Sequence, residues 1–272
     1  MTDLITLTYQ GHIAIITLNQ ASKLNALDRD LYYLLGERLR EVEKREDVFI
    51  TVLTGTGRFF SAGIDVNKFR SQPDDKPNRS EIVRDFVAGN VDITRIFYTH
   101  PKILVVALNG PVIGLSAALV AIADFIYAAP HAYLLTPFSS LGLVAEGGAS
   151  HTFVERLGIS KANEALIMSK PITCEELLAT GFINKVIASP SGRPDDSAGF
   201  LTLVLREVED RLGPHLNQQS LLKIKELIRK PQREALDRQN GLEAFMGVER
   251  LMTGAPQIEF RKISRGEKMH KL

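Results

Sequence analysis

The sequence NGPVIGLSAAL at residues 109–119 joins a strand-like run to the start of a helix. The preceding residues Ile103–Leu108 form a continuous apolar run, which is typical of a buried strand. Residues Leu115–Ala123 are rich in strong helix formers. The first turn of a helix leaves backbone N–H groups without intrahelical partners, and the helix dipole favours negative charge there. The stretch therefore predicts an α/β fold in which a helix presents N–H donors directly after a strand.

A second segment has the same strand-to-turn character. The sequence RFFSAGIDV at residues 58–66 follows the β-branched run Phe49–Thr54, which also predicts a buried strand. Ser-Ala-Gly suits a tight turn with an exposed backbone N–H, and one donor from each turn could stabilise the same developing oxyanion. Taken alone, each segment also fits an ordinary glycine turn of an α/β protein.

Glu146 is the candidate catalytic side chain. It lies in the sequence GLVAEGG at residues 142–148, an apolar stretch that ends in two glycines. Apolar surroundings make a carboxylate costly to ionise and raise its pKa, which suits a general base working near neutral pH. The alternative is a loop glutamate exposed to water, the usual position of a charged residue.

Together these segments resemble the crotonase family, also called the enoyl-CoA hydratase/isomerase superfamily. The resemblance covers roughly residues 8–187 and includes LNAL at residues 24–27 and LGL at residues 141–143. It implies an α/β spiral of ββα units that binds acyl-CoA thioesters and needs no cofactor beyond the coenzyme A of its substrate. The backbone N–H groups of Ile64 and Leu115 would hold the thioester oxygen. The implied substrate-binding residues are Ala62, Gly63, Ile64, Asp65, Val66, Leu115 and Asn90.

The departures from the hydratase pattern indicate the reaction. Hydratases of this family carry two glutamates that hold and activate water, and the matching positions here are Ala118 and Phe138. The placement of Glu146 instead resembles the fungal peroxisomal Δ3,Δ2-enoyl-CoA isomerases. We therefore expect an isomerase of β-oxidation that moves a 3-cis or 3-trans double bond to 2-trans, with Glu146 carrying a proton from C2 to C4. The alternatives are a Δ3,5-Δ2,4-dienoyl-CoA isomerase, which in the family uses an additional acidic residue, and a non-catalytic acyl-CoA-binding member.

Composition excludes several other classes of protein. The chain has 272 residues, a net charge of +1 and no apolar run long enough to span a bilayer, so neither nucleic acid nor a membrane span is indicated. Its one cysteine, Cys174, excludes an intrachain disulfide and a multi-cysteine metal site. Thr173 and Glu176 around it form a capping box that predicts the start of a helix.

The chain is predicted to have two parts. Residues 1–190 would form the spiral core with the active site, and residues 198–272 a helical C-terminal segment through which trimers, or hexamers made of two trimers, would form. The stretch Ala188–Ala198, with two prolines and a glycine, is the boundary. The remaining predicted elements are the strand Ile13–Leu18, a helix Leu31–Val42 capped by Asp28, and the helices Ser80–His100, Phe200–Leu212, Leu221–Ile228 and Arg233–Met252.

The last three residues, His270, Lys271 and Leu272, resemble the peroxisomal address Ser-Lys-Leu. The N-terminus has neither the basic region nor the hydrophobic core of a signal peptide. The sequence therefore predicts location in the peroxisome, with the peroxisomal import receptor as a partner.

Overall fold

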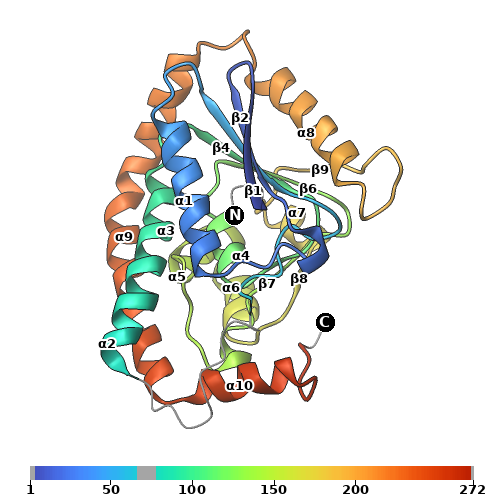
Figure 1. Ribbon diagram of the computed structural model, residues 1–272. Helices are drawn as coiled ribbons and strands as arrows, with labels where there is room; N and C mark the ends of the chain where they lie inside the picture. Colours follow the sequence, from blue (N-terminus) through green and yellow to red (C-terminus); the bar gives the residue numbers. More distant parts are fainter. Residues whose placement is uncertain (1–3, 66–77, 271–272) are drawn as a thin grey trace.

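The computed structural model describes residues 4–65 and 78–270. Among the predicted site and tail residues, Val66, Lys271 and Leu272 lie outside the described part. A twisted sheet runs through the centre, and three long helices lie side by side along one of its flanks (Figure 1). These helices are α1 (Arg29–Glu43), α3 (Ala88–Thr99) and α9 (Gln218–Met252). The mixed α/β architecture with a helical C-terminal segment, predicted from the sequence, is confirmed.

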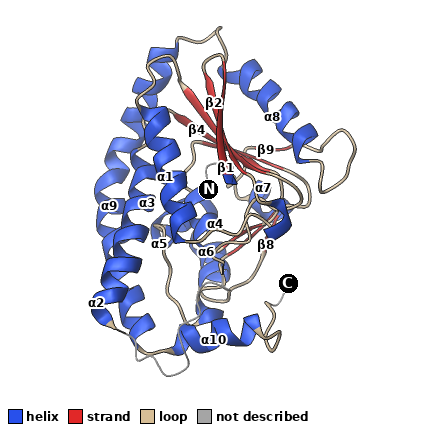
Figure 2. Ribbon diagram, viewed as in Figure 1, coloured by secondary structure: helices blue, strands red, loops and turns tan. Residues whose placement is uncertain are grey.

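Within the described residues the central sheet has six strands (Figure 2). In spatial order they are β1 (Ile5–Gln10), β2 (Ile13–Leu18), β3 (Ile50–Gly55), β4 (Ile103–Leu108), β6 (Phe125–Ala128) and β9 (Lys185–Val186). The first pair is antiparallel and every other pair is parallel. The observed β2 and β4 have the predicted bounds, and β3 is shifted by one residue.

The central strands are buried on both faces. On β4, residues 103, 105 and 107 belong to the core that contains Phe200 and Val204 of α8 (Ser197–Leu212), and residues 104, 106 and 108 belong to the larger core on the other face. Burial on both faces explains why these strands have continuous apolar sequences instead of alternating ones.

The described residues also form a smaller sheet of three strands. It contains β5 (Val112–Ile113), β7 (Tyr133–Leu135) and β8 (Ile172–Thr173). The other helices of the described core are α2 (Arg79–Ile82), α4 (Leu115–Val120), α5 (Ala149–Leu157), α6 (Ile159–Leu166) and α7 (Cys174–Ala179). Because α4 follows β5 at once, the strand–turn–helix succession predicted for residues 103–123 is confirmed.

Two predicted helices are observed with informative details. The Asp28 side chain accepts a hydrogen bond from the Leu31 N–H at 2.9 Å, so it caps α1 as predicted. The predicted helix Ser80–His100 is divided into α2, a π-helical turn at Val83–Val87, and α3. Single π-helical turns inserted into α-helices are frequent near functional sites.

The C-terminal segment consists of α8, α9 and α10 (Ala255–Ser264). The prediction of separate helices at Leu221–Ile228 and Arg233–Met252 is wrong, because α9 continues through Pro231. Before the proline, Lys225 and Arg229 bind Asp124 at 2.7 and 3.0 Å. These contacts fix the first half of the helix to the core and offset the hydrogen bond that proline cannot make.

The predicted association into trimers or hexamers concerns the surface of the C-terminal helices. Leu242, Phe245 and Met246 of α9 are exposed apolar side chains, and association through this segment stays a prediction. No helix of residues 4–65 and 78–270 is both long and apolar enough to cross a membrane.

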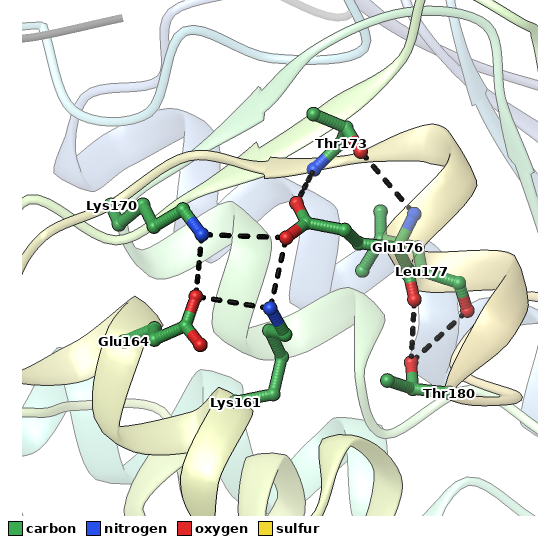
Figure 3. Close-up of polar contacts among 7 residues, drawn as sticks. All are labelled: Lys161, Glu164, Lys170, Thr173, Glu176, Leu177 and Thr180. Carbon is green, nitrogen blue, oxygen red and sulfur yellow. Dashed lines mark hydrogen bonds and ion pairs between the residues drawn. The ribbon is translucent and has the colours of Figure 1, made fainter.

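The capping box around Cys174 is present (Figure 3). Glu176 Oε2 accepts from the Thr173 N–H at 2.9 Å, and Thr173 Oγ1 accepts from the Glu176 N–H at 3.2 Å. Lys161 of α6 binds Glu176 at 2.9 Å and, with the backbone hydrogen bond, lowers the pKa of Glu176 to about 2. The ion pair of Lys161 and Glu176 connects α6 to α7. Cys174, the first residue of α7, is buried and forms no disulfide.

Candidate active site

The first turn is held by the LNAL segment at residues 24–27. The Ala62 N–H donates to the Leu24 carbonyl at 2.9 Å, and the Asp65 N–H donates to the Leu27 carbonyl at 3.0 Å. The Leu27 N–H in turn donates to the carbonyl of Gly63 at 2.8 Å. The LNAL segment therefore fixes the backbone of the predicted substrate-binding residues 62–65.

Two buried asparagines support the loop that leads into this turn. Asn25 Nδ2 donates to the carbonyls of Thr56 and Phe59 at 2.9 and 2.8 Å. Asn109 Nδ2 donates to the carbonyls of Gly57 and Phe59 at 2.8 and 3.0 Å. Both side chains are almost fully buried, so these bonds satisfy backbone groups that water does not reach.

The two predicted turns touch each other. The Ile113 N–H donates to the Ser61 carbonyl at 3.0 Å, and a parallel bridge pairs Ser61 with Val112. A Cβ atom on Gly63 would lie 2.7 Å from the Ile113 carbonyl oxygen, and the φ of Gly63 is +80°. Only glycine suits this position, because it combines a left-handed conformation with a close backbone approach.

The predicted oxyanion donors follow these glycines directly. Ile64 comes after Gly63, and Leu115 is the first residue of α4 after Gly114, whose φ is +63°. Within residues 4–65 and 78–270, neither the Ile64 N–H nor the Leu115 N–H donates to a protein acceptor. Two unpaired donors on adjoining turns can bind one oxyanion.

Gly147 places Glu146 beside α4. Its φ is +71°, and a Cβ atom there would lie 2.7 Å from Cβ of Ala118 and 2.9 Å from Cδ1 of Leu115. The backbone of Gly147, next to the carboxylate, therefore packs on the side chain of Leu115, whose N–H is the second predicted donor. The segment that carries the candidate base Glu146 is a loop, and it contacts α4 through Gly147.

Opposing effects set the pKa of the Glu146 carboxyl group. Burial raises its pKa from 4.5 to about 7, and the negative charge of Glu243 also raises it. A hydrogen bond from Asn90 Nδ2 to Glu146 Oε2, 2.7 Å long, favours the ionised form and lowers the pKa. The group can therefore take up and release a proton near neutral pH.

Asn90, a predicted binding residue, contacts Glu146 in the structure. It is buried on α3, one turn after the π-helical segment, and its side chain donates directly to Glu146. Thr94 Oγ1 donates to the Asn90 carbonyl at 2.7 Å. The asparagine thus orients the carboxylate through a direct hydrogen bond.

Glu243 was missed by the sequence reasoning. It lies on α9 with 5% of its surface exposed, and its carboxylate accepts from the Gly148 N–H at 2.7 Å. It also accepts from the N–H and the hydroxyl of Ser150 at 2.8 and 2.5 Å. The available signal was helical spacing, because position 243 falls on the face marked in the sequence by the apolar residues Leu236, Ala244, Val248 and Leu251.

The positions of the two hydratase glutamates have apolar contacts. Ala118 is fully buried on α4 beneath Gly147, and Phe138 is 2% exposed at the start of a 3₁₀ turn. Among the described residues, no group of three or more His, Cys, Asp and Glu side chains could hold a metal ion.

Comparison with known proteins identifies relatives along the whole chain. The sequence profile described as Enoyl-CoA hydratase/isomerase matches residues 8–191. A protein of Pyricularia oryzae named Delta(3,5)-Delta(2,4)-dienoyl-CoA isomerase is 55% identical over 100% of both chains. The 3,2-trans-enoyl-CoA isomerase of Saccharomyces cerevisiae is 34% identical, covering 98% of this chain and 96% of its own. The solved structure of Pseudomonas aeruginosa OdaA superposes with a TM-score of 0.82 at 26% identity, over 99% and 100% of the two chains.

Replacing Glu146 by Gln should change how stability depends on pH. The folded carboxyl has its pKa raised from 4.5 to about 7, so its contribution to stability is complete below about pH 4.5 and is lost as pH rises to about 7. Because Gln does not titrate, the unfolding free energy of wild type relative to E146Q should fall by about 1–3 kcal/mol across that interval. Urea unfolding at pH 5 and pH 8 measures the difference, and the exposed Glu249→Gln is the control. An equal difference at both pH values would contradict the raised pKa.

Proposed function

Because the chain belongs to the enoyl-CoA hydratase/isomerase family and is an isomerase, we propose that it moves double bonds in unsaturated acyl-CoA thioesters by proton transfer through Glu146. One observation carries the proposal. Gly147, next to Glu146, packs against Leu115 of α4, whose N–H has no acceptor among the described residues and adjoins the turn that carries the Ile64 N–H. A base and two oxyanion donors are the groups that proton abstraction next to a thioester requires.

The proposed chemistry begins at C2 of the acyl chain. Its protons lie between the thioester carbonyl and a double bond, so removing one gives a delocalised enolate whose charge gathers on the thioester oxygen. The Ile64 and Leu115 N–H groups would stabilise that oxygen, and the loss of one such donor typically raises the barrier by about 3 kcal/mol. Protonated Glu146 then returns the proton further along the chain, and the double bonds move into conjugation with the carbonyl.

Asn90 assigns different tasks to the two oxygens of Glu146. Oε2 accepts the asparagine hydrogen bond, whereas Oε1 accepts no hydrogen bond from the described residues. We propose that Oε1 takes the proton. Coenzyme A enters as part of the substrate, and the proposed steps use only Glu146 and backbone N–H groups.

We propose a 3,5-dienoyl-CoA as the preferred substrate, converted to the 2,4-dienoyl-CoA. The support is the full-length likeness to the Pyricularia oryzae protein that carries this activity in its name. The expectation of a Δ3,Δ2 reaction as the main activity followed from the placement of Glu146, and the lack of a second acidic residue in the motifs counted against the dienoyl reaction. The alternative reading of the sequence is therefore the better supported one.

A dienoyl substrate makes a geometric demand on this site. The proton must travel from C2 to C6, and the second nearby carboxylate, Glu243, has its oxygens occupied by Gly148 and Ser150. We therefore propose that Glu146 serves both carbons, which requires the diene to bind bent so that C6 approaches C2.

The second candidate reaction is the conversion of 3-enoyl-CoA to 2-enoyl-CoA. The single candidate base, Glu146, favours this reaction, because C2 and C4 both adjoin C3 and lie within reach of one carboxylate oxygen. The similar Saccharomyces cerevisiae protein carries this reaction in its name. Both reactions share the same first step, so one site can perform them.

Incubation with three substrates tests the proposed function. Purified protein should convert 3,5-dienoyl-CoA to 2,4-dienoyl-CoA and 3-enoyl-CoA to 2-enoyl-CoA, with the larger kcat/KM for the dienoyl ester. It should not hydrate 2-enoyl-CoA at a comparable rate, because Ala118 and Phe138 cannot hold water. Glu146→Gln should lower turnover of both isomerisations at least about 10²-fold. Near-normal turnover by the folded variant, or hydration as fast as isomerisation, would show the proposal to be wrong.

The charge of Glu243 should be visible in the pH dependence of catalysis. Wild-type kcat/KM should rise with pH to a plateau above about 7, because the base must be ionised. Glu243→Gln removes the negative charge that raises the pKa of Glu146, so the rise should move to lower pH. The exposed Glu249→Gln changes the same charge on the same helix and should leave the curve in place. Coincident curves for all three proteins would show that the charge of Glu243 does not raise the pKa of Glu146.

We propose that the protein resides in the peroxisome, on the basis of its last three residues. His270 is partly buried, and Lys271 and Leu272 lie outside the described residues. Deleting Leu272 should leave catalysis intact and leave an N-terminally fluorescent protein in the cytosol, in cells that lack a related partner with its own signal. Continued import of the truncated protein in those cells would show that the tail is not the address.

A further inference from the structure

A chain of buried hydroxyl groups lies directly behind the two turns of the candidate oxyanion hole. Ser61 Oγ donates to the Asn25 carbonyl at 2.9 Å and lies 3.0 Å from Ser116 Oγ. Ser116 Oγ lies 2.9 Å from the hydroxyl of Tyr32, which α1 contributes. The three hydroxyl-bearing residues are between 0 and 6% exposed. None of them is a member of the catalytic constellation proposed above.

The direction of every hydrogen bond in this chain can be assigned. A hydroxyl group has one proton to donate, and a carbonyl oxygen can only accept. Ser61 uses its proton on the Asn25 carbonyl, so Ser116 must donate to Ser61. Ser116 has then used its own proton, so Tyr32 must donate to Ser116. Burial raises the pKa of the Tyr32 phenol well above its ordinary value, which keeps this donor protonated.

The chain joins the two donor turns to each other. Ser61 Oγ also accepts from the Gly63 N–H at 3.1 Å, next to Ile64. Ser116 follows Leu115 in the first turn of α4. The hydrogen bond between the two serines is therefore a side-chain link between the segments that carry the two unpaired N–H groups.

We propose that Ser61, Ser116 and Tyr32 are positioning residues that set the separation and direction of the Ile64 and Leu115 N–H groups. The proposal rests on the proposed function, because it takes those N–H groups as the oxyanion hole. Donors must be placed where the charge develops, and a misplacement of about 1 Å can cost roughly 10²-fold in rate. The three buried hydroxyl groups hold this placement through their hydrogen bonds with one another and with the Asn25 carbonyl.

The three substitutions should have graded effects. Tyr32→Phe leaves the serine–serine link intact and should lower kcat only about twofold to threefold, because the turns stay joined. Ser116→Ala breaks the link and should lower kcat about tenfold, and Ser61→Ala, which also frees the Gly63 N–H, should lower it further. KM should change little. Thr54→Val is the matched control, because it removes a buried hydroxyl group that donates to the Ala107 carbonyl outside the chain.

Ser116→Ala leaves the Tyr32 hydroxyl buried without its acceptor, which costs stability. The double variant Ser116→Ala/Tyr32→Phe removes both groups and leaves no orphan. It provides the same test if the single variant fails to fold.

Binding of two unreactive ligands separates positioning from a purely structural role. The probes are a saturated acyl-CoA thioester and the S-alkyl-CoA thioether of equal chain length, which lacks the carbonyl oxygen. Calorimetry should show that wild type prefers the thioester, and that the Ser116 variants lose most of this preference while their affinity for the thioether is unchanged.

An unchanged preference in folded Ser116 variants, or an equal loss of affinity for both ligands, would overturn this inference and leave the proposed function standing. Failure of wild type to bind either ligand would overturn the proposed function and this inference with it.

Discussion

Two backbone turns approach each other so closely that only glycine fits at their contact. Gly63 meets the Ile113 carbonyl at a distance that leaves no room for a side chain, and the bridge between Ser61 and Val112 joins the two strands' continuations. Parallel strands deliver both turns to the same edge of the sheet, which is where α/β proteins usually place their ligands. The buried Asn25 and Asn109 then satisfy the loop that this approach would otherwise leave without partners.

Glu146 shows how three elements share the control of one proton. The loop before α5 carries the carboxylate, α3 supplies the hydrogen bond of Asn90, and α9 supplies the charge of Glu243. Burial and the neighbouring charge favour the protonated form, and the asparagine favours the ionised form. The result is a group that changes charge near neutrality, which a carboxylate in water does not do.

Sequence reasoning reached the parts of this protein that are encoded locally. Apolar runs located β2, β3 and β4, and the cap at Asp28 and the capping box at Thr173 located two helices. The sequence predicts a break in α9 around Pro231. The ion pairs of Lys225 and Arg229 that hold this helix connect to Asp124, about 100 residues earlier in the chain, and a local pattern does not reveal them. The contact of Glu243 and the hydrogen bonds of Tyr32, Ser61 and Ser116 could not be predicted for the same reason. These residues are far apart in the sequence and meet only in the folded chain.

The position of Glu243 has a consequence for how such enzymes diversify. The profile that identifies the family ends at residue 191, whereas Glu243, whose negative charge raises the pKa of Glu146, lies beyond it on α9. An exchange at position 243 would therefore shift the pKa of Glu146 without altering any residue that the family profile matches. The family profile thus reports ancestry, whereas the pKa of Glu146 also depends on a helix that the profile does not cover.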